Sequence, residues 1–359
     1  MNAPRVLHLI REANETAAPY NEHVLSGVEV VGAASFFPPA LSGLPWSHLR
    51  HGDGSLASYL RTIRIAVDDF RPDVVHAHSP HVGAAWVAAS TGMARRIPLV
   101  YTLHTSWDNV SSRNRALLLP VFLSAARVVF CSEASFASIP RELMRQLGPR
   151  VAVVPNGVAL DRLDGVAAQA GARHDRSTLN VLVVGRLLEK KDPRTSLRAL
   201  ARVAELPIRL AYVGRGDLAE SLEQEAARLG LGERVEFRGV VAREELYRIL
   251  AVEADVLVST SRTEGLPLAP LEAMALGVPV VLSDIAPHRE IVEGLVGVPL
   301  VPPGDDRSLA LALRSLAEAG AEELRIRGAR GRAHVRAAFG LDLMLRRYAR
   351  LYAEVVRGR

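Results

Sequence analysis

Cysteine is almost absent from this sequence, which has one in 359 residues, and aromatic residues make up only 5% of the chain. The single cysteine, Cys131, excludes a disulfide framework and a cysteine-rich metal site. Because Cys131 lies in an apolar run at 127–132, we expect it to be a small buried side chain in a protein of a reducing compartment.

Long apolar runs are also missing. No segment reaches the roughly 18 to 20 residues that a helix needs to cross a bilayer. The chain passes from Met1 directly into an apolar segment at 5–10, without the pattern of a signal peptide. We therefore expect a soluble, cytoplasmic protein.

Charge is not concentrated in any one part of the chain. The net charge is +5, but the arginines are spread along the sequence and no basic stripe is interleaved with aromatic residues. A nucleic-acid partner is therefore not expected. No Asp-x-Asp pair occurs either, so a bound diphosphate would have no obvious metal clamp. We predict that the protein needs no metal and no other cofactor.

The order of strand and helix patterns predicts an α/β protein with two domains. A chain of this length exceeds what one hydrophobic core usually supports. Strand patterns alternate with helix patterns throughout, as in parallel sheets covered by helices. The expected strands lie near 5–10, 28–35, 73–77, 98–103, 127–131, 150–154, 180–186, 208–213, 234–238, 255–259, 278–282 and 298–301. The first six strands and the last six each predict a Rossmann-like domain. We expect the two domains to face each other across a cleft at the carboxyl ends of their strands, where such folds bind ligands.

The polar segment 161–179 lacks periodicity and is predicted to be a linker between the domains. We place the first domain at 1–160 and the second at 161–339. The last segment has apolar residues at helical spacing. We expect a final helix at 340–359 that crosses back to the first domain.

The most informative motif spans 254–282, where two glutamates, Glu264 and Glu272, stand eight residues apart. They flank a turn between a buried strand and a helix in which Pro267 is the expected first residue and Gly277 the stop. A helix that begins at the carboxyl end of a parallel strand offers backbone N–H groups to an anion such as phosphate. Carboxylates there need other partners, and sugar hydroxyls are suitable donors. Two solvated surface acids are the alternative.

Two basic residues follow the first strand of the second domain. Arg186 and Lys191 lie in the segment 185–191 and are expected at the same strand ends as the glutamate motif. Fixed cations stabilise the charge that develops on a departing nucleoside diphosphate. A loop with solvated basic residues is the alternative interpretation.

Together, these motifs resemble those of the group 1 glycosyltransferases (family 4), whose two-domain fold is called GT-B. The similarity extends over nearly the whole chain. Its segments are 71–79, 101–105, 154–158, 185–191, 213–216, 235–240 and 264–274. The last has the glutamate, seven residues, glutamate spacing of that family.

The resemblance implies a retaining glycosyltransferase that moves a hexose-type sugar from a UDP- or GDP-sugar to a hydroxyl acceptor, in the synthesis of a glycan, glycolipid or glycosylated metabolite. By the same resemblance, Arg186 and Lys191 neutralise the diphosphate and Glu272 holds the ribose. Glu264 lies beside the sugar, and His104 faces that sugar from the first domain. Backbone groups complete the expected donor site, at Val240, Gly265, Leu266, Leu268 and Leu271.

One loop departs from the family pattern. The segment 11–20 has Ala17 and Ala18 where relatives carry a Gly-Gly pair that lets the backbone approach the diphosphate. This loop could therefore bind either the donor or the acceptor. In the second case, the acceptor would be bound through Asn14, Glu15 or Tyr20.

Several other interpretations stay open. Residues 213–219 fit a variant dinucleotide fingerprint, which would indicate an NAD-dependent oxidoreductase, although not on the first strand of the domain. His76, His78, His81 and His104 could suggest zinc, although buried or loop histidines that fill the wall of the cleft are the favoured interpretation. The basic, apolar segment 113–123 could contact an anionic membrane, although a helix packed on the first sheet is favoured. A non-catalytic sugar-nucleotide-binding subunit and an epimerase or hydrolase of the same fold are further alternatives.

Overall fold

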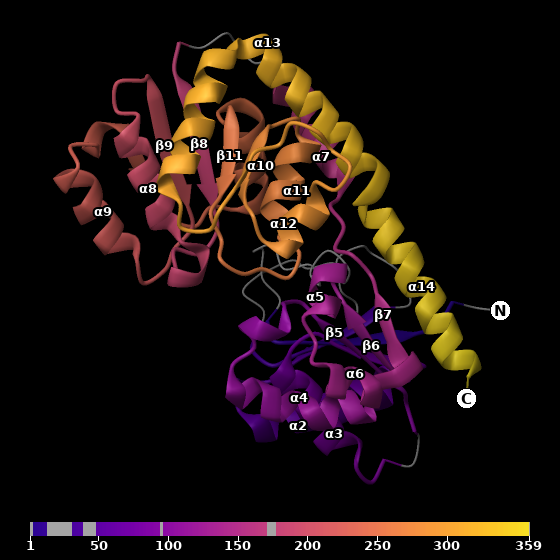
Figure 1. Ribbon diagram of the computed structural model, residues 1–359. Coiled ribbons are helices and arrows are strands. Elements are labelled where there is room, and N and C mark those ends of the chain that lie inside the picture. Colours follow the sequence, from indigo (N-terminus) through magenta and orange to yellow (C-terminus); the bar gives the residue numbers. More distant parts are fainter. Residues whose placement is uncertain (1–2, 13–30, 39–47, 94–95, 171–176, 359) are drawn as a thin grey trace. The chain divides into compact units, whose positions relative to one another are not determined.

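The chain divides into two compact units. The computed structural model describes residues 3–12, 31–38, 48–93, 96–170 and 177–358. Unit 1 comprises Met1–Gly157 and Leu341–Arg359, and unit 2 comprises Val158–Gly340 (Figure 1). The predicted boundaries at 160 and 340 lie close to these divisions.

Unit 1 is built on a seven-stranded parallel sheet with the order β3-β2-β1-β4-β5-β6-β7. Its strands are β1 Val6–Ile10, β2 Val31–Ser35, β3 Leu49–His51, β4 Val74–Ala77, β5 Leu99–Leu103, β6 Arg127–Phe130 and β7 Val151–Val153. The short edge strand β3 was not predicted, because three residues that are mostly exposed carry no strand pattern. The other six agree with the predicted strands, of which 28–30 lies outside the described residues.

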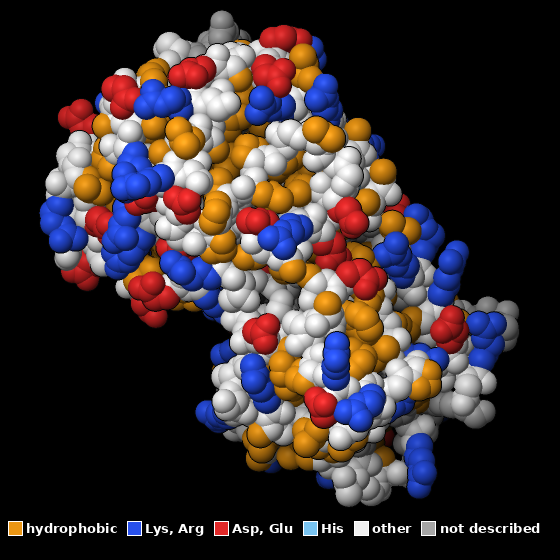
Figure 2. Space-filling view, in the orientation of Figure 1, with side chains coloured by type: hydrophobic (Ala, Val, Ile, Leu, Met, Phe, Trp, Pro, Cys, Tyr) orange, Lys and Arg blue, Asp and Glu red, His pale blue; other side chains and the backbone are white. Residues whose placement is uncertain are grey.

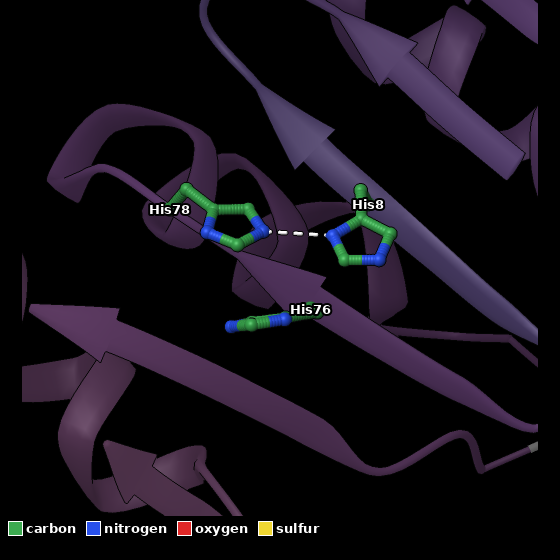
Figure 3. Close-up of side chains that lie close together, drawn as sticks. All are labelled: His8, His76 and His78. Atoms are coloured by element: carbon green, nitrogen blue, oxygen red, sulfur yellow. Dashed lines mark hydrogen bonds between the residues drawn. The ribbon is translucent and has the colours of Figure 1, made fainter. Parts of the chain in front are cut away.

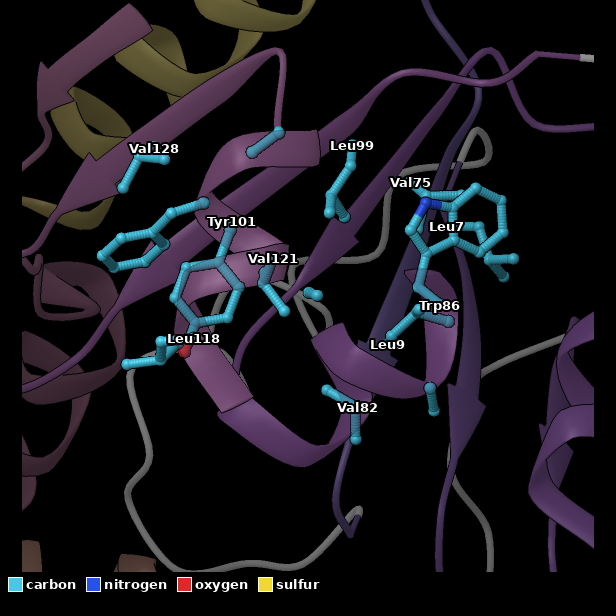
Figure 4. Close-up of a cluster of buried hydrophobic side chains, with 14 of the residues drawn as sticks. Leu7, Leu9, Val75, Val82, Trp86, Leu99, Tyr101, Leu118, Val121 and Val128 are labelled. Atoms are coloured by element: carbon cyan, nitrogen blue, oxygen red, sulfur yellow. The ribbon is translucent and has the colours of Figure 1, made fainter. Parts of the chain in front are cut away.

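One face of this sheet packs against the helices between the strands. They are α2 Leu56–Phe70, α3 Pro80–Ser90, α4 Ser112–Ser124, α5 Glu133–Ala137 and α6 Arg141–Leu147. Trp86 of α3 and Leu118 of α4 lie with Leu9, Val75 and Tyr101 of the strands in a continuous buried cluster (Figure 4). Continuous apolar strands are expected in a sheet covered on both faces.

The last helix, α14 (Leu341–Arg357), covers the other face, as predicted from its periodicity. Met344, Tyr348 and Leu351 are buried in one cluster with Val74 and Val100 of the strands. Unit 1 is thus made from both ends of the chain. Cys131, which follows β6, is buried, as expected.

Unit 2 has a six-stranded parallel sheet with the order β10-β9-β8-β11-β12-β13. Its strands are β8 Leu179–Val184, β9 Ile208–Val213, β10 Val235–Phe237, β11 Val256–Ser259, β12 Val280–Ser283 and β13 Leu300–Val301. Its helices are α7 Leu160–Ala170, α8 Pro193–Arg202, α9 Ala219–Arg228, α10 Arg243–Val252, α11 Leu268–Ala275, α12 Ala286–Ile291 and α13 Asp306–Ala338. Together the two units form the predicted α/β fold with two Rossmann-like sheets.

The predicted linker at 161–179 is wrong, because α7 and the first residue of β8 occupy much of it. Leu163 of α7 is buried, and Asp164 binds Arg332 and Arg336 of α13. The helix was missed because a glycine and several small residues weaken its periodicity. Residues 171–176 lie outside the described residues.

Helix α13 crosses the end of α11 at a close contact between two glycines. A Cβ atom added to Gly328 would lie 2.0 Å from the carbonyl oxygen of Gly277. Three residues further along the same helix, a Cβ atom added to Gly331 would lie 3.5 Å from Cγ of Met274, which is an ordinary contact.

We therefore expect Gly328→Ala to lower the free energy of unfolding by about 1–3 kcal/mol, the usual cost of overpacking. The matched variant Gly331→Ala should be neutral or slightly stabilising, because alanine favours a helix by roughly 0.5–1 kcal/mol over glycine. Denaturant unfolding of both variants checks this prediction. Equal stability of the two would contradict it.

No helix among the described residues is long and apolar enough to cross a membrane. The face drawn in Figure 2 carries acidic and basic side chains interspersed with one another, without an extended area of one sign. Helix α4 packs on the sheet through Leu118, Val121 and Phe122, as favoured above, while Leu119 and Leu123 are exposed.

Candidate functional site

Lys191 and Glu264 form an ion pair at the carboxyl ends of neighbouring strands. Lys191 ends a short turn after β8, and Glu264 lies in the loop after β11. The ammonium group of Lys191 donates to Oε1 of Glu264, and the hydroxyl of Ser261 donates to the same oxygen at 2.7 Å. The Glu264 residue is 9% exposed, so a buried carboxylate is neutralised by a partly exposed lysine. The resemblance assigned Lys191 to the diphosphate and Glu264 to the sugar. In the structure the two side chains bind each other directly.

Further positive charge surrounds this pair. Arg186 is exposed in the loop after β8, and Lys190 precedes Lys191. Burial lowers the pKa of Lys190, and the nearby charges of Arg186 and Lys191 lower it further. Cations that destabilise one another in this way are stabilised when an anion binds. No role was predicted for Lys190 from the sequence, although its position next to Lys191 indicated a second cation at the site.

Glu272 lies on α11 and is 1% exposed. Its Oε1 atom accepts from the hydroxyl of Tyr247 at 3.0 Å and from the guanidinium of Arg243 at 3.2 Å, both on α10. The Nε atom of Arg243 also donates to the Tyr247 hydroxyl at 2.7 Å. Burial lowers the pKa of Arg243, but Glu272 and Tyr247 together outweigh it and leave that pKa above its ordinary value. Glu272 is therefore bound by two residues, Arg243 and Tyr247, that were not predicted from the sequence.

The residues between Glu264 and Glu272 are buried or half-buried. Leu266, Leu268 and Leu271 bury their side chains in unit 2. Helix α11 begins at Leu268, one residue later than predicted, with Pro267 as its N-cap, and Gly277 beyond its end has a φ of 73°. Gly265 is buried in the same turn, whereas Val240 is 55% exposed in a different loop.

His104 follows β5 and belongs to unit 1. It is partly buried, and burial lowers its pKa to about 4. The ring is therefore neutral at neutral pH. Its Nε2 atom lies 3.1 Å from Nδ1 of His78. Asn14, Glu15, Ala17, Ala18 and Tyr20 lie outside the described residues.

Comparisons with known proteins decide the family. Residues 169–333 match the model described as Glycosyl transferases group 1, and residues 18–162 match Glycosyltransferase Family 4. A phosphatidyl-myo-inositol mannosyltransferase of Mycobacterium leprae is 35% identical over 277 residues, which cover 73% of this chain and 68% of that protein. The chain belongs to the group 1 glycosyltransferases.

Two further relatives of this glycosyltransferase agree with that assignment. A D-inositol 3-phosphate glycosyltransferase of Streptomyces bingchenggensis is 30% identical, over 89% of this chain and 78% of that protein. The solved structure of HepE from Anabaena in complex with UDP and glucose is 22% identical and aligns with a TM-score of 0.80, over 98% of this chain and 99% of that one. This structural likeness shows the GT-B fold.

The suspected dinucleotide fingerprint has a packing role in the glycosyltransferase. A Cβ atom on Gly214 would lie 1.9 Å from the carbonyl oxygen of Gly185, and one on Gly216 would lie 2.2 Å from that of Leu187. Both glycines thus let the loop after β9 touch the loop that carries Arg186. This contact accounts for the glycines without a bound NAD.

His8, His76 and His78 can each offer one ring nitrogen within 4.8 Å of the others, which is a geometric condition for a metal site (Figure 3). His8 was not in the histidine set considered from the sequence, and His81 and His104 are not in this one. Nδ1 of His8 lies 2.8 Å from Nε2 of His78, at hydrogen-bond distance. Both nitrogens of His76 also lie 2.7 Å from hydroxyl oxygens, those of Tyr352 and Thr102. Each of the three rings thus takes part in hydrogen bonding.

We expect glycosyl transfer by this chain to persist after treatment with a chelator. The basis is the cluster of Arg186, Lys190 and Lys191, which can neutralise a diphosphate without a divalent cation. Initial rates with and without EDTA, before and after addition of Mg²⁺ or Mn²⁺, test this. A rate lost with EDTA and restored by either cation would contradict it.

Proposed function

We propose that this enzyme transfers a hexose from a UDP- or GDP-sugar to a hydroxyl acceptor with retention of anomeric configuration. The proposal rests on the ion pair between Lys191 and the buried Glu264. Arg186 and Lys190 lie near this pair. A sugar diphosphate needs both cations for its phosphates and acceptors for its hydroxyls. The solved complex of HepE with UDP and glucose, on the same fold, supports this ligand class.

In the proposed donor complex, Arg186 and Lys191 bind the diphosphate and Glu272 accepts from the ribose hydroxyls. Glu264 lies beside the transferred sugar, while the backbone at Gly265, Leu266, Leu268 and Leu271 meets sugar hydroxyls or phosphate. Backbone near Val240 meets the base, and neutral His104 is a further catalytic residue that acts on the sugar.

The same residues have roles in the chemical step. As the bond from the sugar to the diphosphate breaks, Arg186 and Lys191 stabilise the charge on the leaving oxygen. That oxygen helps to deprotonate the acceptor hydroxyl, which attacks the same face of the sugar. Glu264 positions the sugar and stabilises its developing positive charge.

A thermal-shift panel of UDP, GDP and their hexose derivatives tests the donor class. A nucleotide at about 100 times its dissociation constant should stabilise the wild type by roughly 2.7 kcal/mol. We expect Glu272→Gln to lose most of this shift, because a neutral amide is a weaker acceptor for ribose hydroxyls. The exposed residue Glu293 gives a matched control, Glu293→Gln, which should keep it. Stabilisation by NAD alone, or by none of these ligands, would overturn the proposal.

Turnover separates the remaining alternatives. Consumption of the donor without any acceptor would favour an epimerase or hydrolase. Binding without turnover on any acceptor would favour a non-catalytic sugar-nucleotide-binding subunit.

The acceptor could be reached at a membrane surface. On α4, Leu119 is 47% exposed and Leu123 is 54% exposed, and Arg113 lies on the same helix. Apolar and basic side chains on one exposed helix are typical of interfacial contact. We therefore propose that this enzyme contacts the membrane surface peripherally through residues 113–123.

A further inference from the structure

Three histidines, His8, His78 and His104, form a continuous hydrogen-bonded chain. Nδ1 of His8 lies 2.8 Å from Nε2 of His78, and Nδ1 of His78 lies 3.1 Å from Nε2 of His104. The first two rings are 10° from coplanar with centroids 5.1 Å apart, and the second two are 25° from coplanar at 5.3 Å. With the bonded nitrogens this close, the rings meet edge to edge (Figure 3 shows the first pair).

The fold fixes these rings. His8 is in the middle of β1, His78 follows β4 and His104 follows β5, which are adjacent strands. His8 is fully buried and His78 is 5% exposed. The ring of His76 packs against that of His78 with centroids 3.9 Å apart, and is itself held by Tyr352 of α14 and Thr102 of β5. His76 therefore supports the chain without being part of it.

For three neutral rings, proton counting restricts the chain to two arrangements. A neutral imidazole carries one N–H group, so one ring nitrogen donates and the other accepts. Each of the two bonds needs one proton between its nitrogens. If Nε2 of His104 accepts, His78 must donate from Nδ1 and accept at Nε2, so Nδ1 of His8 donates. If Nε2 of His104 donates, every bond is reversed. The three tautomers therefore change together.

We propose that His8 and His78 are positioning residues that set which nitrogen of His104 carries the proton. This inference rests on the proposed function, in which neutral His104 meets the donor sugar. The tautomer decides whether His104 can donate to a sugar oxygen or accept from a hydroxyl. His8 is linked to His104 through His78, so a change at His8 is transmitted to His104 by the two hydrogen bonds.

The experiment measures the tautomer directly and needs no turnover. Long-range ¹H–¹⁵N spectra of the full chain, with its histidines labelled, distinguish protonated from unprotonated ring nitrogens. In the wild type we expect His8, His78 and His104 to share one of the two coupled arrangements. His8→Phe should change the ¹⁵N shifts of His104, and His8→Asn, whose amide can replace Nδ1, should restore them. The matched control is His76→Gln, which should leave the His104 tautomer unchanged.

Kinetics give a second readout. His8→Phe should lower kcat by roughly three- to ten-fold, the value of one net hydrogen bond, with KM for the donor little changed and with recovery in His8→Asn. An unchanged His104 tautomer in His8→Phe would overturn the proposal, as would an equal change in His76→Gln. A joint shift of His8, His76 and His78 on addition of Zn²⁺ would instead identify a metal site. If the three tautomers are coupled as expected but the protein shows no turnover, the proposed function is refuted. The proposed coupling of the three histidines is not.

Discussion

Arg243→Met is expected to lower the free energy of unfolding by about 3–5 kcal/mol, because it leaves the carboxylate of Glu272 buried without its ionic partner. The side chains of Arg243 and Glu272 are 8% and 1% exposed, so water cannot replace the lost charge. The transition of unit 2 in urea measures the loss. Donor binding should weaken as well, since Glu272 is the proposed ribose acceptor.

Two variants separate charge from packing in this prediction. The double variant Arg243→Met with Glu272→Gln should recover much of the stability, because a neutral amide can still accept from Tyr247. Arg248→Met, on the same helix, removes a partner of Glu245 from an exposed pair with side chains 54% and 42% exposed. It should cost at most about 1 kcal/mol. Losses of equal size in Arg243→Met and Arg248→Met would refute the argument.

Lys191→Ala is expected to lower kcat/KM by about 10²- to 10³-fold, the usual effect of removing a preorganised electrostatic contact. Two effects combine in this variant. The departing diphosphate loses a cation, and Glu264 loses the ammonium group that neutralises and orients it. Steady-state rates with a donor found by the thermal-shift panel measure the change.

Lys190→Ala is the matched comparison, because it removes one charge of the same cluster but leaves the pair of Lys191 and Glu264 in place. We expect a decrease in kcat/KM of less than about ten-fold, as for a partly screened charge. If Lys190→Ala were as harmful as Lys191→Ala, total positive charge would matter and the pair with Glu264 would not.

The sequence was informative where short motifs follow strand ends. Lys191 and Glu264 come from adjacent parallel strands, and the carboxyl ends of such strands meet at one edge of a sheet. Their proximity therefore followed from the strand pattern. Their direct ion pair did not, because it depends on side-chain conformations in two irregular loops.

Other members of the site could not be found in this way. Arg243 and Tyr247 are 29 and 25 residues from Glu272, and a basic residue that begins an amphipathic helix ordinarily indicates a solvated surface. His8 was overlooked inside an apolar strand, although it lies opposite His76 in the register of β1 and β4. Helix α7 was taken for a linker because small residues obscured its buried side.

The return of α14 to the first sheet affects the order in which the chain folds during synthesis. Residues 158–340 form unit 2 as one continuous segment, so all of its contacts become available before the C-terminus is made. Unit 1 begins first, but the valines on one face of its sheet have no cover until Tyr348 and Leu351 emerge. The first unit to be translated is therefore the last to be completed, and its exposed sheet face is where a nascent chain would need protection from aggregation.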